Sequence, residues 1–269
     1  MRQSCVRALL LAAALAWGAT MPPGSMAQAP QPSPPTSAPD QTAIESVTLA
    51  RGVKTQNLFG SGLVTPVDPT TTFISTDLPY AVVRVKNLTP DTTVSLQLSD
   101  PTGPAYKLAA VVPHNIRGKP KQFDFAAPLY ILGTDFESHV GTWHLQVTLN
   151  GQPQTTTAFV WTQASRLELP NIKALVDANP TEPDLHWRYG AALALFDHTA
   201  EAIQELQSAI RLDHRYALYH ITLGRIYERQ GRPADAIREF KTALELHGST
   251  WDAIFSSWAQ AHLTKLQGH

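Results

Sequence analysis

Cysteine is almost absent from this chain, which has Cys5 as its single example among 269 residues. Cys5 precedes an apolar run at residues 8–19, whereas the lipid-bearing cysteine of a bacterial lipoprotein follows such a run and becomes the mature N-terminus. We therefore expect a mature protein without cysteine. This excludes disulfides, thiolate metal sites and a cysteine nucleophile.

Long hydrophobic runs are absent as well. The stretch at residues 8–19 has about 12 residues, fewer than the ~20 that span a bilayer. It follows Arg2 and Arg7 and precedes small residues ending at Ala27, which is the pattern of a secretory signal. We expect residues 1–27 to be a cleaved signal peptide and the product to be periplasmic or secreted, without stable membrane insertion. An uncleaved anchor is the alternative.

Signals for catalysis and for charged ligands are also missing. The formal net charge is −1, with basic residues scattered among acidic ones, so nothing attracts the chain generally to nucleic acid or anionic lipid. The sequence has no His-Glu-x-x-His, Gly-x-Ser-x-Gly, Cys-x-x-Cys or phosphate-binding Gly-rich loop. His139 and His144 are close together, but their odd separation places them on opposite faces of a strand. We expect no enzyme activity, no cofactor and no metal site.

Proline, by contrast, is concentrated near the N-terminus. Residues 22–39 hold seven of the 21 prolines, mixed with Ser, Ala, Gln and Thr. Such a composition cannot bury apolar surface. We expect residues 28–41 to be a Pro-rich disordered linker, with a proline-rich ligand motif as the alternative.

Residues 42–165 show the period of two that marks half-buried antiparallel strands. In residues 143–149 every odd position is apolar and every even one is polar. Asn150-Gly151 supplies the two positive-φ residues of a tight hairpin. Strands are expected near residues 44–51, 80–87, 92–99, 105–112, 121–131, 141–149 and 154–162. Seven short strands with such turns predict a β-sandwich.

Part of this region resembles the immunoglobulin-like domains of bacterial exported proteins. The resemblance covers residues 73–162 and rests on Phe73-x-x-x-Asp77, the strand from Tyr80 to Leu88, Asp100-Pro101-x-Gly103, Gly141-Thr142-Trp143 and Asn150-Gly151. The cysteine pair of antibody domains is missing, so the likeness is to disulfide-free sandwiches that act as spacers or adhesion modules. It implies no catalysis.

Residues 166–269 change to helical spacing and repeat with a period of 34 residues. The period aligns Gly190 with Gly224, Ala202 with Ala236 and Leu206 with Phe240. Leu223-Gly224-x-x-Tyr227 and Ala236-x-x-x-Phe240-x-x-Ala243 resemble the signature of the tetratricopeptide repeat (TPR). In that family two antiparallel helices cross at the glycine and the first alanine, where a larger side chain would push them apart.

The resemblance implies an array of helix pairs. Its expected parts are repeats at residues 183–214 and 217–248, a partial repeat at 170–180 and a closing helix at 250–266. The flanking parts are needed because about three repeats are the usual minimum for a stable array. The expected fold class is multidomain α+β: an immunoglobulin-like antiparallel β-sandwich (42–165) followed by an all-α TPR array (166–269).

Stacked TPR repeats form a concave surface lined by the first helix of each pair. Carried over by position, the expected partner-binding residues are Trp187, Ala191, Leu218, Ile221, Arg225, Glu228 and Phe255. This mixed apolar and charged surface suits a peptide or a helix. The positions that clamp a terminal carboxylate in some members hold Trp187, Ala191, Thr222, Asp252 and Ser256, which argues against such a clamp. The alternative for Trp187 and Phe255 is packing within the array.

The closing helix carries Trp251, Ile254, Phe255 and Trp258 at helical spacing. A closing helix usually has a polar outer face, so this stripe is unusual for one. We expect most of it to pack on the preceding repeat. A partner, the β-region or self-association through this C-terminal helix would use the remainder.

Two functions fit the sequence. The first is an exported, non-catalytic adaptor or scaffold that binds a protein or peptide partner through the concave TPR face, with the β-sandwich as a spacer or second binding module. The second is an accessory subunit or carbohydrate-associated protein of a cell-envelope enzyme system, with the sandwich contacting glycan.

Overall fold

The structure is a computed structural model that describes residues 42–56, 63–89, 92–111, 122–246 and 252–268. The expected signal peptide (1–27) and Pro-rich linker (28–41) lie outside the described residues, as do residues 250–251 of the expected closing helix. Asp40–His269 forms one compact unit. In the described part of the chain, no helix is both long enough and apolar enough to cross a membrane.

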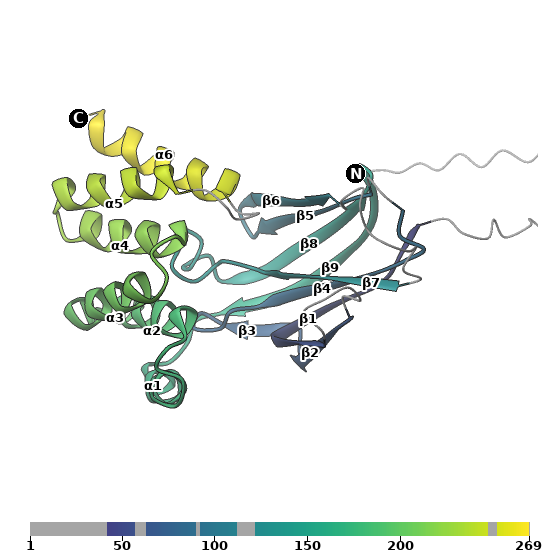
Figure 1. Cartoon of the computed structure of the whole chain (residues 1–269), viewed down its shortest axis with the longest axis horizontal. Coiled ribbons are helices and arrows are strands. Elements are labelled where there is room, and N and C mark those ends of the chain that lie inside the picture. The colour runs from purple at the N-terminus through teal and green to yellow at the C-terminus, as the bar shows by residue number, and fades with distance from the viewer. Residues whose placement is uncertain (1–41, 57–62, 90–91, 112–121, 247–251, 269) are drawn as a thin grey trace, which may run out of the picture. The chain divides into compact units, whose positions relative to one another are not determined.

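The first half of this unit is β-rich, with nine described strands in two sheets (Figure 1). One sheet has the order β2-β1-β4-β7 and contains β1 (Ala43–Gln56), β2 (Leu63–Pro69), β4 (Tyr80–Lys86) and β7 (Gln122–Pro128). The other has the order β3-β9-β8-β5-β6 and contains β3 (Thr72–Ile74), β5 (Thr93–Asp100), β6 (Gly103–Val111), β8 (Gly141–Leu149) and β9 (Gln152–Thr162). β3 runs parallel to β9, whereas the other described pairs are antiparallel.

The alternation in the sequence explains how β8 is placed. Trp143, Leu145 and Val147 are buried, while His144 and Gln146 between them are exposed. One face of the strand therefore packs into the core and the other meets solvent. The turn that follows has two positive φ angles, 49° and 79°, as a tight hairpin with an Asn-Gly sequence requires.

Each of the seven expected strands overlaps an observed one, but two strands were not predicted. β2 contains Pro66 and Pro69, and β3 has only three residues, so neither shows the alternation of a half-buried strand. The expected strand at 121–131 ends early, at Pro128, because the chain leaves the sheet there. The β-rich part of the predicted fold class is confirmed, whereas its immunoglobulin-like assignment stays a prediction.

Six described α-helices make up the second half, and Figure 1 shows them stacked in chain order. They are α1 (Leu169–Ala178), α2 (Pro183–Leu195), α3 (Thr199–Leu212), α4 (Ala217–Arg229), α5 (Pro233–Glu245) and α6 (Asp252–Gln267). The expected repeats contain α2 with α3 and α4 with α5. α1 and α6 fall at the expected partial repeat and closing helix.

Small residues let the two helices of each pair touch. A Cβ atom placed on Gly190 would lie 3.0 Å from both the Ala202 carbonyl oxygen and the Leu206 Cγ. One placed on Gly224 would lie 2.8 Å from Cε1 of Phe240, closer than carbon atoms pack. The two equivalent glycines therefore set the spacing of α2 with α3 and of α4 with α5.

The β-rich region and the helices share one hydrophobic core. Polar contacts join them as well: Nε of Arg188 on α2 donates 2.7 Å to the carbonyl of Thr76, and its guanidinium lies 3.5 Å from Asp77. Asp77 also accepts a hydrogen bond from Arg51 of β1, 3.0 Å away. The two halves therefore form a single packed body.

Candidate functional site on the inner face of the helical array

The inner face of the array is covered by a loop of the same chain, residues 129–140, which joins β7 to β8. Leu129, Ile131 and Leu132 of this loop are completely buried. Between them, the ring of Tyr130 packs edge-on against Trp187 of α2, with centroids 5.8 Å apart. These contacts make the loop part of the core.

Tyr130 also connects the loop to the last helix. Its ring centroid lies 5.9 Å from that of Phe255 on α6. Its hydroxyl forms a hydrogen bond with the hydroxyl of Tyr216, the residue before α4. Burial raises the pKa of both phenols, that of Tyr216 to about 12, so both stay neutral and can donate a proton to this bond.

The loop backbone approaches the helices most closely at Gly133. Its φ is +74°, and a Cβ atom there would lie 3.1 Å from Oγ1 of Thr222 and 3.2 Å from Cζ2 of Trp187. The Thr222 hydroxyl accepts a hydrogen bond from Nε1 of Trp187 at 3.0 Å, and it lies 3.3 Å from the Gly133 carbonyl oxygen. Glycine is therefore required for the backbone angle and for the contact.

Beyond Gly133 the contact becomes ionic. Nε of Arg225 on α4 donates to Oδ1 of Asp135 at 2.9 Å, and the same guanidinium lies 3.5 Å from Glu137. One turn further along α4, Arg229 lies 3.6 Å from Glu137. Two loop carboxylates thus face two arginines of a single helix.

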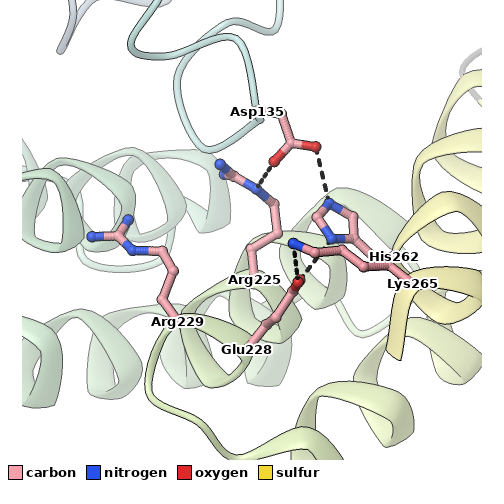
Figure 2. Close-up of a pocket in the computed structure, with 6 residues that line it drawn as sticks. All are labelled: Asp135, Arg225, Glu228, Arg229, His262 and Lys265. Carbon is pink, nitrogen blue, oxygen red and sulfur yellow. Dashed lines mark hydrogen bonds and ion pairs between the residues drawn. The ribbon is translucent and has the colours of Figure 1, made fainter. Parts of the chain in front are cut away.

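Helix α6 completes the cluster through His262, whose two ring nitrogens each face a carboxylate (Figure 2). Nδ1 lies 2.7 Å from Glu228 of α4 and Nε2 lies 3.1 Å from Asp135. Lys265 adds a 2.7 Å contact with Glu228. In Figure 2 Arg229 stands apart from this network, with no dashed contact to the other labelled residues.

These side chains line a hollow of about 220 Å³, which we call the charged hollow. Its residues are Asp135, Arg225, Glu228, Arg229, His262 and Lys265. Arg229 and Lys265 are its most accessible cations, with 49% and 67% of their side chains exposed. The hollow therefore presents two accessible positive groups, Arg229 beside Glu137 and Lys265 beside Glu228.

The pKa values of the two carboxyls reflect these partners. The hydrogen bond with His262, with a further contribution from Arg225, holds the pKa of Asp135 well below its usual range. Partial burial alone would raise the pKa of Glu228, but Lys265 and His262 outweigh it and hold that pKa below its usual value. Both groups are therefore anions at neutral pH.

Acid is expected to weaken the junction between the loop and the helices. A carboxyl whose pKa is lowered by folding stabilises the native state above its ordinary pKa, 3.8 for Asp135 and 4.5 for Glu228, and that stability is lost as pH falls. We expect the melting temperature to fall between about pH 5 and about pH 2, and Asp135→Asn to show a smaller fall. Thermal melting across this range measures it. The same pH dependence in both proteins would contradict the assignment.

The structure places the seven residues predicted from the sequence on α2, α4 and α6. Trp187, Ala191, Leu218, Ile221 and Phe255 are at most 1% exposed. The side chains of Arg225 and Glu228 are 11% and 14% exposed and face the charged hollow. Trp187, Arg225 and Phe255 contact the loop directly, so an external partner at these residues would have to displace it. That they bind such a partner stays a prediction.

Several residues of the site could not be found by sequence reasoning. The apolar run from Leu129 to Leu132 is visible in the sequence, but most of it falls within the strand expected at 121–131. Arg229 and Lys265 look like ordinary solvent-facing helix residues. His262 follows Glu228 by one 34-residue period, the same offset that aligns the two repeats. That spacing indicates from the sequence alone that His262 and Glu228 are neighbours.

Comparison with known proteins identifies part of the array. The sequence model of the tetratricopeptide repeat family matches residues 217–249, which contain α4 and α5. Residues 217–249 are a tetratricopeptide repeat. The TPR prediction is thereby confirmed for the second expected repeat, 217–248. No curated protein sequence matches this chain.

Solved structures give a partial likeness. One is MamA (41-end) from Desulfovibrio magneticus RS-1, with 28% identity and a TM-score of 0.30 over 30% of this chain and 46% of that one. Another is the type III secretion translocator chaperone SycD of Yersinia enterocolitica, with 15% identity and a TM-score of 0.35 over 37% of this chain and 76% of that one. The chain thus spans about half the length of the MamA structure. Likenesses at these TM-scores carry no functional conclusion.

Proposed function

We propose that this chain is a non-catalytic adaptor that binds a protein or peptide partner through its TPR array. The observation that carries the proposal is the contact with residues 129–140. The inner helices already hold a peptide segment, through an aromatic contact at Tyr130, a close approach at Gly133 and carboxylates at Asp135 and Glu137. Aromatic packing combined with arginine–carboxylate pairs is chemistry that TPR-type grooves can offer to a ligand.

We propose that the external partner binds at the charged hollow. Displacing the loop would expose Leu129, Ile131 and Leu132, and burying each such side chain contributes ~1.5–3 kcal/mol. A partner that displaced the loop would have to supply the same stabilisation through its own contacts. At the hollow, the accessible cations of Arg229 and Lys265 can pair with acidic side chains without moving the loop. Arg225 and Glu228 line the same hollow, whereas Trp187 and Phe255 pack against Tyr130 of the loop.

The adaptor is further proposed to be exported, as periplasmic or secreted protein, on the strength of residues 1–27. Its β-rich region is proposed to be an immunoglobulin-like sandwich that serves as a spacer. The strand order supports this: β5, β8 and β9 are neighbours in one sheet, as the C, F and G strands are in immunoglobulin domains. β1, β4 and β7 are neighbours in the other.

Removing the two accessible cations is expected to weaken capture of the partner. In co-purification from the protein's native cells, the double variant Arg229→Gln/Lys265→Gln should retain a specific protein at least about tenfold less than wild type, equivalent to ~1.4 kcal/mol. The matched control is Lys173→Gln/Arg215→Gln, which removes two exposed cations elsewhere on the array. Equal retention by both variants, with unchanged melting, would refute binding at the charged hollow.

A further inference from the structure

Two strand edges of the β-rich region face one another across a groove. Among the described strands, residues 43–49 of β1 pair only with β4, and residues 152–159 of β9 pair only with β8. A groove of about 290 Å³ lies between them, lined by residues 44–47 of β1 and by Gln154, Thr155 and Thr157 of β9. Unpaired strand edges present backbone groups that can pair with another chain.

The chain itself shows what kind of segment fits between these edges. The connection from β2 to β3 lies at the end of the groove. There the amide of Thr70 donates to the carbonyl of Leu49 on β1 at 3.0 Å, and the amide of Val160 on β9 donates to the carbonyl of Thr71 at 2.7 Å. A backbone segment thus bridges the two edges with one hydrogen bond to each. Beyond Leu49 and Val160, no described segment continues the bridge.

The edges of β1 and β9 run in the same direction but differ in how well their residues favour pairing with a further strand. Both run toward the bridge with increasing residue number, so an inserted strand has the same orientation relative to each. Residues 154–159 of β9 contain neither proline nor charge, and their three threonines favour strand structure. β1 carries the exposed Glu45 and an irregular register between Ile44 and Ser46, features that discourage pairing. β9 is therefore the pairing edge, and β1 forms the opposite wall.

We propose that this groove binds an extended segment of a partner protein, which adds as a strand to the free edge of β9. The segment carries a lysine or arginine opposite Glu45, the one charged residue among the seven that line the groove. Residues 22–39 of the chain itself are poorly suited to the role, because their seven prolines lack amide donors. The site is separate from the charged hollow and does not depend on the proposed adaptor function.

A designed peptide tests the proposal on the full chain. The probe is a blocked heptapeptide, Thr-Val-Thr-Lys-Thr-Val-Thr, at about 1 mM, a concentration suited to a weak ligand. Hydrogen exchange should show at least about tenfold added protection within residues 154–159. Replacing both valines of the peptide with proline should remove the protection. Replacing its lysine with glutamate should weaken binding to wild type, and Glu45→Lys should restore binding of that glutamate peptide.

Proline substitution in β9 is the matching test on the protein side. Neighbouring amides of a strand point to opposite sides, so one of Thr156 and Thr157 faces β8 and the other faces the groove. The proline variant whose lost amide faces the groove should melt like wild type, because its pairing with β8 is intact. We expect that variant, Thr156→Pro or Thr157→Pro, to bind the peptide at least about tenfold more weakly than wild type.

Four results would overturn the proposal. The first is that the lysine peptide leaves residues 154–159 unprotected, and the second is that the stable proline variant binds it like wild type. The third is protection that appears without peptide and rises with protein concentration, which would make the occupant a second copy. The fourth is concentration-independent protection in the free chain, which would make it the chain's own leading segment.

Discussion

Gly224→Leu is expected to destabilise the whole of residues 40–269. The first added carbon already lies 2.8 Å from the ring of Phe240, which is completely buried and cannot move outward. Phe240 stacks on His262, with ring centroids 4.8 Å apart, so any shift reaches the charged hollow. Overpacking of this kind costs ~1–3 kcal/mol, occasionally more. Melting followed by circular dichroism should show a midpoint lower by roughly 5–10 °C.

Lys241→Leu is the matched control, because it adds leucine to the exposed face of α5, the helix that Gly224 faces. Exposed substitutions of this kind usually change stability by less than ~0.5 kcal/mol. If Gly224→Leu melted like this control, α4 and α5 would not be in contact at the glycine, and the alignment of the two repeats would fail.

Trp187→Ala is expected to cost still more, ~3–5 kcal/mol, as large-to-small changes of buried aromatic residues do. The indole is completely buried, packs on Tyr130 and Gly133, and donates its N–H to Thr222. Denaturant unfolding at equilibrium measures the loss. The residue then acts as part of the core, whatever partner the array binds.

Trp187→Phe separates the two roles of the indole. It keeps most of the apolar contact and removes the hydrogen bond to Thr222, so the expected loss is smaller, nearer ~1–2 kcal/mol. Wild-type stability in Trp187→Ala, together with weaker capture of a partner, would show that the side chain is a surface ligand contact. That outcome would support Trp187 as a partner-binding residue, as expected from the sequence, and would contradict its burial in the core.

The periodic parts of the fold were predictable because periodicity is a local property. β8 follows from alternation over seven residues, 143–149, and the α4–α5 pair follows from small residues spaced to match a known repeat. β2, with its two prolines, and the short β3 carry no such pattern. They are held by pairing with β1 and β9, which a sequence pattern does not reveal.

The helix residues of the site could be predicted because position within a repeat is a local property, whereas the loop residues could not. Trp187 lies on α2, and Ile221 and Arg225 lie on α4, which are the first helices of the two expected repeats. What covers those helices depends on Tyr130, Gly133 and Asp135, which are close to them only in the folded chain. Arg225 and Asp135 are 90 residues apart. Local reasoning could predict the surface but not that the chain itself supplies a ligand for it.

The long-range contacts of this loop are also expected to slow folding. Helices α2 to α6 can form from nearby residues, but covering their inner faces needs contacts between residues far apart in the sequence, since Tyr130 and Tyr216 are separated by 86 residues. Proteins dominated by such non-local contacts fold slowly. During synthesis, Tyr130 and its apolar neighbours emerge long before Phe255, their partner on α6. The core is therefore complete only when α6 has been synthesised. A chain that stopped before α6 would leave the face of Tyr130 that contacts Phe255 exposed, and exposed aromatic surface of this kind binds chaperones and promotes aggregation.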